Sequence, residues 1–198
     1  MKNIAKLQYI SRDDDKYSHS EQARIMFENG IEWVQLRMKK SSYSEMIKQA
    51  ETAMKYAINF RGRLIVNDYI DIVREIDAHG IHLGLNDTPI DKAREILGND
   101  VIIGGTANTI DDIKLQATKG ADYIGLGPFR FTTTKEKLSP MLGLEGYQKL
   151  MYQAQKQNLS VPFIAVGGIT DTDIEDIIKT GMHGIAVSGA LFRKIIKQ

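Results

Sequence analysis

The chain of 198 residues contains no cysteine. This absence excludes a disulfide framework, a thiolate metal site and a cysteine nucleophile. Neither sign of charge is in excess, because the chain has 26 Lys and Arg residues and 25 Asp and Glu residues, and its formal net charge is only +1. With no basic tail or strip, we do not expect a nucleic-acid partner, and any positive charge that serves function must be local.

Long apolar runs are also lacking. No stretch approaches the roughly 20 apolar residues of a membrane helix, so a membrane partner is not expected. The first ten residues carry Lys2 and Lys6 and lack the apolar segment of a secretory signal. The 4 prolines are scattered and no low-complexity linker interrupts the chain. We therefore expect a cytoplasmic protein in which residues 1–198 form a single domain, and whether it forms a homo-oligomer stays open.

What the chain does contain is a regular alternation of short apolar runs, turns and helical patterns. Eight runs are typical of strands buried on both faces, at residues 6–11, 32–37, 63–67, 80–84, 101–105, 123–127, 162–167 and 184–188. Between them, Thr109 with Asp112 indicates a helix start, and Gly181 is typical of a helix end. Strands that alternate with helices predict parallel pairing. Eight such units predict a single (β/α)₈ TIM barrel of the α/β class, with an open doubly wound sheet as the alternative.

In a barrel, chemistry is expected at the carboxyl ends of the strands. On the second expected strand, Gln35, Arg37 and Lys39 share one face, because successive side chains alternate. The planar guanidinium of Arg37 can donate two parallel hydrogen bonds, and the ammonium of Lys39 adds a compact positive charge. Together they predict an anion clamp that binds phosphate oxygens. A solvated strand end followed by a charged loop is the alternative.

Carboxylates follow the third and fourth expected strands, at Asp68 and Asp87. Each alone is better explained as a helix cap. Together, at the mouths of adjacent strands and beside an anion clamp, the two carboxylates favour one shared hard cation. Mg²⁺ suits them because it takes oxygen ligands, keeps several waters and bridges to substrate phosphates.

The longest connection follows the sixth expected strand and carries Thr132, Thr133, Thr134 and Lys135. Long connections are often functional lids, and these hydroxyl, N–H and ammonium groups can hold a second phosphate. A polar threonine-rich loop without a ligand is the alternative. After the last two strands, Gly168 and the pair Ser188 and Gly189 allow a phosphate to approach the backbone, although a tight turn is the commoner explanation for each alone.

Taken together, these strand-end segments resemble those of the thiamine-phosphate synthase family over nearly the whole chain. The matching segments are QLRMK at 35–39, LIVND at 64–68, GIHLG at 80–84 followed by Asp87, GADYIGLGP at 120–128 with Thr132, Thr134 and Lys135, and AVGGI at 165–169. The resemblance implies a transferase that joins 4-amino-2-methyl-5-(diphosphooxymethyl)pyrimidine to a thiazole phosphate. Thiamine phosphate and diphosphate would be the products, formed by a Mg²⁺-dependent, dissociative reaction that needs no protein nucleophile.

The resemblance also implies roles for individual residues. Those that would neutralise the leaving diphosphate are Arg37, Lys39 and Lys135. Those that would hold the pyrimidine diphosphate are Gln35, Arg37, Lys39, Asn67, Thr106 and Lys135. Those that would coordinate the Mg²⁺ cofactor are Asp68 and Asp87. Those that would bind the thiazole phosphate are Thr132, Thr133, Thr134, Gly168, Ser188 and Gly189.

The chain departs from the family at Leu85, where glutamine is common, and at Thr106 and Asn108, where the family has Ser-Ala-His. Serine also comes one position early, at Ser188. Three alternatives therefore stay open. A related thiazole tautomerase shares the barrel and tends to carry histidine in place of Asn108. A sugar-phosphate isomerase or epimerase would need a general acid–base pair facing the barrel axis. A catalytically silent barrel would bind a thiamine precursor without turnover.

Overall fold

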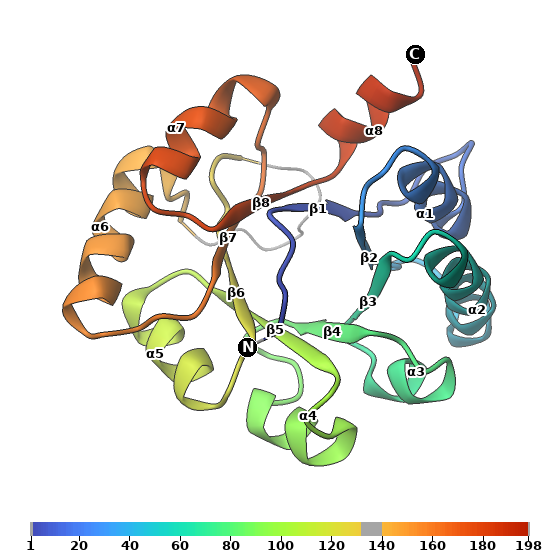
Figure 1. The fold of residues 1–198 in the computed structure, drawn as a ribbon, viewed down its shortest axis with the longest axis horizontal. Coiled ribbons are helices and arrows are strands. Elements are labelled where there is room, and N and C mark those ends of the chain that lie inside the picture. Colours follow the sequence, from blue (N-terminus) through green and yellow to red (C-terminus); the bar gives the residue numbers. More distant parts are fainter. Residues whose placement is uncertain (1, 132–139, 198) are drawn as a thin grey trace.

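The structure is a computed structural model that describes residues 2–131 and 140–197. Within these ranges, eight parallel strands pair in chain order, and the last strand pairs with the first, which closes a barrel. The helices form a ring around the strands (Figure 1). The expected (β/α)₈ barrel is therefore confirmed, and the open doubly wound sheet is excluded.

Each expected strand is present, and its ends differ from the expected ones by at most two residues. The strands are Leu7–Ile10 (β1), Trp33–Leu36 (β2), Arg63–Asn67 (β3), Gly80–Leu83 (β4), Ile102–Ala107 (β5), Tyr123–Leu126 (β6), Phe163–Val166 (β7) and Gly184–Val187 (β8). The helices are His19–Glu28 (α1), Tyr43–Asn59 (α2), Ile70–Glu75 (α3), Ile90–Leu97 (α4), Ile110–Thr118 (α5), Gly143–Lys156 (α6), the short 3₁₀ helix Asp171–Asp173 (η1), Ile174–Lys179 (α7) and Gly189–Ile195 (α8). None of the helices described here is long and apolar enough to cross a membrane.

Local sequence explains where several helices begin and end. Thr109 Oγ1 accepts from the Asp112 N–H, and the Asp112 carboxylate accepts from the Thr109 N–H, which confirms the expected start of α5. Ser18 and Glu21 form the same reciprocal pair at the start of α1. Beyond the end of α7, Gly181 has a φ of 97°, a conformation that glycine adopts without steric cost.

Apolar side chains pack on both sides of the strand wall. Inside the barrel, Trp33 and Tyr123 belong to one cluster, and their rings meet edge to face with centroids 5.7 Å apart. Outside, Val34 and Leu36 belong to the cluster that includes Ala50 of α2. The alternation on β2 therefore directs Trp33 and Gln35 toward the inside, opposite to Val34 and Leu36.

An ion cluster joins the strands at their amino-terminal ends. Lys2 Nζ and an Arg94 guanidinium nitrogen lie 2.8 and 2.7 Å from Asp122 Oδ2. Both cations also donate to the Val101 carbonyl, at 2.6 Å each, and Asp122 Oδ2 accepts from the Ile103 N–H at 2.8 Å. Although burial opposes it, hydrogen bonds from Lys2, Ile103 and Arg94 hold the pKa of Asp122 below its usual value. The cluster thus links the N-terminal segment, α4, β5 and β6.

We expect Asp122→Asn to lower the free energy of unfolding at pH 7 by about 1–3 kcal/mol, because two half-buried cations lose their shared anion. A carboxylate whose pKa is depressed on folding contributes fully above its unfolded pKa, and the contribution is lost as pH falls through the folded value. The variant should therefore differ most from the wild type above about pH 4. Urea unfolding followed at several pH values measures this.

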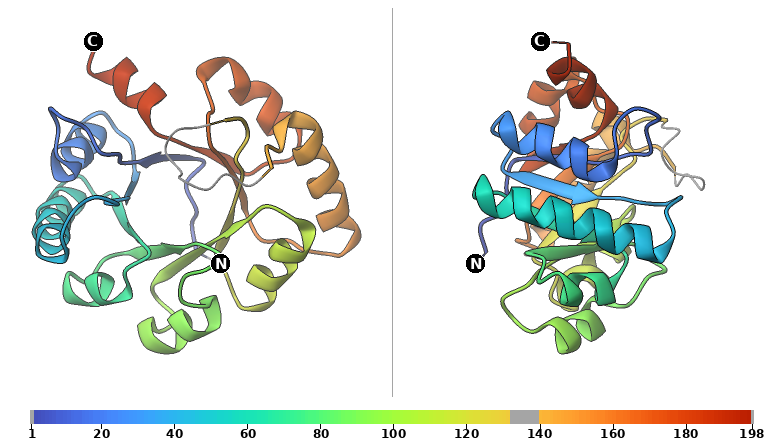
Figure 2. Two further views of the ribbon diagram at one scale, coloured as in Figure 1. Left: turned by 180° about the vertical axis from the view of Figure 1, so that it is seen from behind. Right: turned by 90° about the vertical axis from the view of Figure 1, so that its right-hand side faces the viewer.

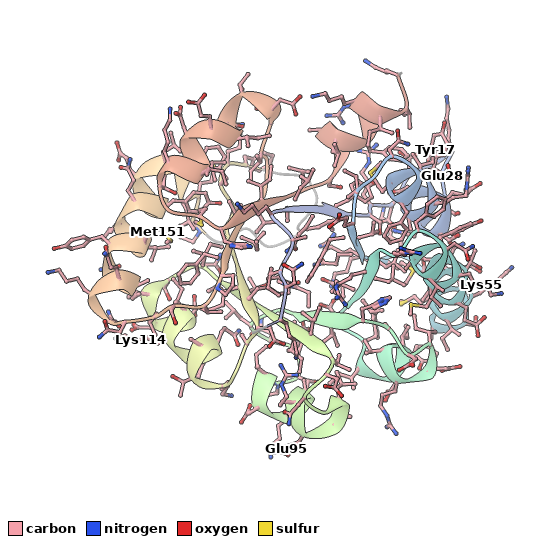
Figure 3. All side chains as sticks on the ribbon, viewed as in Figure 1. Tyr17, Glu28, Lys55, Glu95, Lys114 and Met151 are labelled. Carbon is pink, nitrogen blue, oxygen red and sulfur yellow. The ribbon has the colours of Figure 1, made fainter. Side chains whose placement is uncertain are left out.

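The control is Glu95→Gln, because Glu95 lies on the outer side of α4 (Figure 3) and pairs there with the exposed Lys92. An exposed pair of this kind contributes little, so the change should stay below about 0.5 kcal/mol. If the free energy of unfolding fell equally in both variants, the ion cluster would stabilise the protein no more than an exposed ion pair does.

The loops that follow the strands lie on the opposite face of the barrel. In the side view, β2 points away from the side on which the N-terminus lies (Figure 2). The polar residues that the sequence places at strand ends therefore lie at this carboxyl-terminal face, away from the ion cluster. The stabilising ion cluster and the candidate site residues therefore lie at opposite ends of the barrel. In barrels of this kind, active sites are found at the carboxyl-terminal face.

Candidate functional site

Polar side chains from neighbouring strands meet at the carboxyl-terminal face. Gln35 on β2 and Asn67 at the end of β3 are both buried. Arg37 follows β2 and is half-buried, while the exposed Lys39 forms an ion pair with Asp68. The expected anion clamp and the expected carboxylates therefore lie next to each other across β2 and β3.

The two expected metal ligands are held in place by backbone contacts. The Asp68 N–H donates to the His82 carbonyl at 3.0 Å, and Asp87 Oδ2 accepts from the Gly84 N–H at 2.6 Å. Neither side chain caps a helix. Burial raises the pKa of Asp68, and the adjacent Asp87 carboxyl raises it further, while the Lys39 ammonium opposes both effects.

This pair of carboxyl groups fits a hard divalent cation. Two carboxyls in contact disfavour full ionisation, and a cation held between them would remove that penalty. Within the described ranges, no group of three or more His, Cys, Asp or Glu side chains could hold a metal. A Mg²⁺ ion bound to Asp68 and Asp87 would therefore take its remaining ligands from water and substrate oxygens, which is how Mg²⁺ is commonly bound.

Arg37 is supported by residues that no sequence pattern singles out. Its N–H donates to Ser11 Oγ at 3.0 Å, and that hydroxyl lies 2.7 Å from Nδ1 of His19. The His19 Nε2 atom faces Asp13 Oδ1 at 3.3 Å. Burial lowers the pKa of His19, while the neighbouring Asp13 carboxylate opposes this effect. The loop after β1 thus fixes the point at which Arg37 leaves β2.

A chain of hydrogen bonds lies inside the barrel, next to Thr106 on β5. Nε2 of His82 lies 3.0 Å from Thr106 Oγ1, and Nδ1 of the same ring lies 3.0 Å from Tyr123 Oη. Tyr123 is fully buried, and burial raises its pKa while a hydrogen bond from the Gln35 side chain lowers it. Three strands, β4, β5 and β6, are therefore linked by side-chain hydrogen bonds inside the barrel, next to Gln35 of β2.

The loop after β7 is fastened to the segment after β6. Gly168 has a φ of 70°, and a Cβ there would lie 2.5 Å from Arg130 Cγ. Arg130 donates to the Gly168 carbonyl at 2.9 Å and to both carboxylate oxygens of Asp173 at 2.7 Å. The close approach and the left-handed backbone both explain why glycine stands at 168.

A second group of donors lies at the start of α8. Among the described residues, Ser188 Oγ and Arg12 Nε are buried atoms without a hydrogen-bond partner. A Cβ on Gly189 would lie 3.0 and 3.1 Å from guanidinium nitrogens of Arg193 and Arg12. Two cations, an unsatisfied hydroxyl and a glycine backbone therefore come together. Arg12 was not expected here, because only barrel closure brings the end of β1 beside the end of β8.

The remaining expected residues, Thr132, Thr133, Thr134 and Lys135, lie outside the described residues, and their roles stay predictions.

Comparisons with known proteins agree over most of the chain. A family model described as thiamine monophosphate synthase matches residues 7–191. A thiamine-phosphate synthase of Phocaeicola vulgatus is 46% identical over 187 residues, which cover 94% of this chain and 90% of the relative. One from Bacteroides thetaiotaomicron is 43% identical over 190 residues, covering 96% and 91%. The solved structure of a thiamine phosphate pyrophosphorylase from Pyrococcus furiosus has a TM-score of 0.81 and 29% identity, and the match covers 97% of this chain and 95% of that one.

Proposed function

The chain belongs to the thiamine-phosphate synthase family and shares its transferase function, and we propose that it works with Mg²⁺ by a dissociative mechanism at the carboxyl-terminal face. The observation that carries this proposal is the ion pair between Lys39 and Asp68 at the end of β3, with Asp87 beyond the end of the adjacent β4. Two carboxyls and a cationic group at neighbouring strand ends form a donor set suited to a metal and a diphosphate together.

In this mechanism the C–O bond to the pyrimidine methylene breaks first, and its electron pair leaves with the diphosphate. Mg²⁺, held by Asp68 and Asp87, would supply positive charge to the leaving group. Arg37 and Lys39 bind diphosphate oxygens, and the Ser11 hydroxyl keeps the Arg37 backbone in position. The aminopyrimidine ring stabilises the resulting cation, and the thiazole nitrogen donates its electron pair to the methylene carbon.

The interior amides supply orientation and no covalent step. Gln35 and Asn67 are buried at the ends of β2 and β3, beside the chain that includes Thr106. They would hold the aminopyrimidine ring with its methylene toward the diphosphate clamp. Lys135 would add a further cation to the leaving group, as the family resemblance implies.

We assign the thiazole phosphate to the loops after β7 and β8. Gly168 adopts a conformation suited to glycine, and Gly189, which follows Ser188, lies beside Arg12. The unsatisfied Ser188 hydroxyl and the buried guanidinium nitrogen of Arg12 support an anion at this place. The threonines at 132–134 would complete the subsite.

The tautomerase alternative is disfavoured at Asn108. Its side chain donates to the Gly127 carbonyl, and its N–H donates to the Asp112 carboxylate at 3.0 Å. A side-chain amide neither takes up nor releases a proton near neutral pH, so Asn108 cannot act as the proton carrier that a tautomerase needs.

The test is a coupling assay with purified protein, the pyrimidine diphosphate and the thiazole phosphate. We expect diphosphate and thiamine phosphate to appear in equal amounts when Mg²⁺ is present, and EDTA to stop both. Product formation at the same rate without a divalent cation would reject the metal. Folded protein that forms neither product would reject the function and favour the silent barrel.

A further inference from the structure

We propose that the ion pair between Arg130 and Asp173 is a positioning unit for the thiazole phosphate, because it holds the loop after β7 with two backbone N–H groups directed toward that ligand. The pair joins the segment that follows β6 to the short helix η1. This inference rests on the proposed place of the thiazole phosphate beside Gly168. It concerns what orients the donors of this subsite, and neither member of the pair is assigned a contact with the ligand.

The carbonyl groups of the loop are bound by residues that follow β6. The Gly167 carbonyl accepts from the Arg130 N–H at 3.1 Å, and the Gly168 carbonyl accepts from Arg130 Nη1 at 2.9 Å. The Val166 carbonyl, at the end of β7, accepts from the Phe129 N–H at 2.9 Å and begins the same series. One arginine therefore binds two successive peptide groups of the loop, the first with its backbone and the second with its side chain.

The direction of these carbonyls fixes the direction of the N–H groups that follow them. In a trans peptide the C=O and the next N–H point in opposite directions, and the peptides of this loop are trans. The N–H groups of Gly168 and Ile169 therefore point away from Arg130. Among the described residues, neither N–H has a hydrogen-bond acceptor. Because β7 lies between β6 and β8, these donors face the side on which Ser188 and Gly189 follow β8, and successive N–H groups of this kind bind anions.

The backbone of the loop needs support to keep this orientation. Gly167 and Gly168 have φ values of 97° and 70°, a region that glycine enters and leaves at little cost. The aliphatic part of Arg130 packs against this point, since a Cβ on Gly168 would lie 2.5 Å from Arg130 Cγ. Without the arginine, both peptide groups lose the partners of their carbonyls and become free to rotate.

Asp173 holds the guanidinium in place from the far end of the loop. Its two carboxylate oxygens each accept from Arg130 at 2.7 Å, and Oδ2 also accepts from the N–H and the hydroxyl of Thr170 at 2.7 Å each. The hydrogen bond from Arg130 lowers the pKa of Asp173 to about 2, so the carboxylate is charged at neutral pH. The guanidinium also lies 4.8 Å from the centroid of the Phe129 ring, which stacks on Tyr147 of α6. The pair is thus anchored both to η1 and to the core.

The geometry distinguishes this pair from an ordinary surface ion pair. The Arg130 side chain is 45% exposed, and exposed pairs usually contribute little to stability. Here one guanidinium donates to both Asp173 oxygens and to the Gly168 carbonyl, which requires a planar group with several donors. We therefore expect its loss to change ligand binding more than folding.

Steady-state kinetics of Arg130→Met test the inference, because methionine keeps an apolar stem against Gly168 and lacks the guanidinium. KM for the thiazole phosphate should rise about tenfold, while kcat and KM for the pyrimidine diphosphate stay within about twofold. Arg130→Lys should recover little of this loss, since one ammonium nitrogen cannot replace the planar fork. An unchanged KM for the thiazole phosphate in Arg130→Met, or full recovery in Arg130→Lys, would overturn the inference.

Asp173→Asn tests the other half of the pair. Asparagine keeps an oxygen for Thr170 but lacks the charge that holds Arg130, so KM for the thiazole phosphate should rise about fivefold. Because the two residues act as one unit, the double variant should be no worse than Arg130→Met alone. If the two effects multiplied in the double variant, the residues would act separately and the inference would fail.

The matched control is Lys194→Met. Lys194 of α8 pairs with Asp171 of η1 at 2.6 Å, so this exposed ion pair also ties η1 to a neighbouring element. Its loss removes one positive charge near the same loop, and KM for the thiazole phosphate should stay within about twofold. An equal rise in Lys194→Met would show that any cation beside η1 has this effect, which would overturn the special role of Arg130.

Binding measurements separate this inference from the proposed function. A wild-type protein that forms no thiamine phosphate rejects the proposed function. Calorimetry with the thiazole phosphate alone then decides the inference, because Kd should be about tenfold higher in Arg130→Met than in the wild type, and equal values would overturn it. The corresponding thiazole alcohol lacks the phosphate, so its affinity should not differ between the two proteins. An equal loss of affinity for the alcohol would show that the pair does not act on the phosphate.

Discussion

We expect replacement of Asp68 by alanine to lower kcat/KM for thiamine phosphate formation by about 10²–10³-fold and to leave the protein folded. The variant removes one of the two carboxyls that meet at the ends of β3 and β4. The remaining Asp87 cannot hold a hard cation with comparable strength, so the rate should depend on much higher Mg²⁺ concentrations. The measurement is the steady-state rate over a Mg²⁺ titration, with circular dichroism to verify folding.

Backbone strain must be separated from metal binding in this experiment. Asp68 has a φ of 70°, and this left-handed conformation is less favourable for alanine than for aspartate or asparagine. Asp77 shares this conformation with a φ of 54° and lies in the turn before β4, away from the carboxyl-terminal face. Asp77→Ala should therefore lose similar stability and keep full activity. Asp68→Asn, which tolerates the backbone and lacks the charge, should behave like Asp68→Ala, and normal turnover at ordinary Mg²⁺ would remove Asp68 from the metal site.

The barrel could be predicted because strands buried on both faces leave continuous apolar runs in the sequence. The strand boundaries followed from the polar turns, and the start of α5 followed from the pairing of Thr109 with Asp112. On β2, alternation alone predicted that Gln35 and Arg37 share one face, opposite to Val34 and Leu36. Those features are local, so periodicity and spacing report them directly.

The contacts that organise the site are not local, and the sequence could not show them. His82 and Tyr123 are 41 positions apart, and their hydrogen bond depends on the register of β4, β5 and β6. Arg12 lies beside Gly189 only because β8 pairs with β1. In the sequence, no regular spacing connects any of these residues to the residue that it contacts in the structure. Only closure of the barrel gives them neighbours.

The family resemblance adds a further distinction. It implies which residues bind each substrate, but it does not show which contacts position those residues. The support of Arg37 by Ser11 and His19 comes from the structure alone. The Arg37 N–H is hydrogen-bonded to Ser11 in the loop after β1. This contact holds in place the backbone from which the guanidinium side chain extends.

The second large effect is expected at that arginine. Arg37→Ala should raise KM for the pyrimidine diphosphate about 100-fold, because a bidentate donor to the diphosphate is lost at a half-buried position. Arg37→Lys should recover only part of this, since a point charge cannot reproduce the planar fork. Initial rates at saturating thiazole phosphate give the KM, and calorimetry with the unreacted diphosphate substrate gives the affinity.

Arg24→Ala is the control for the loss of one positive charge. Arg24 pairs with Glu28 on the exposed side of α1, so its removal changes the net charge equally without touching the site. Binding in this variant should stay within about twofold of the wild type. If Arg37→Ala raised KM for the thiazole phosphate instead, the arginine would serve the other subsite. Unchanged affinity for the pyrimidine diphosphate would dismiss the clamp, and the diphosphate would then have to be held by Lys39 and the metal alone.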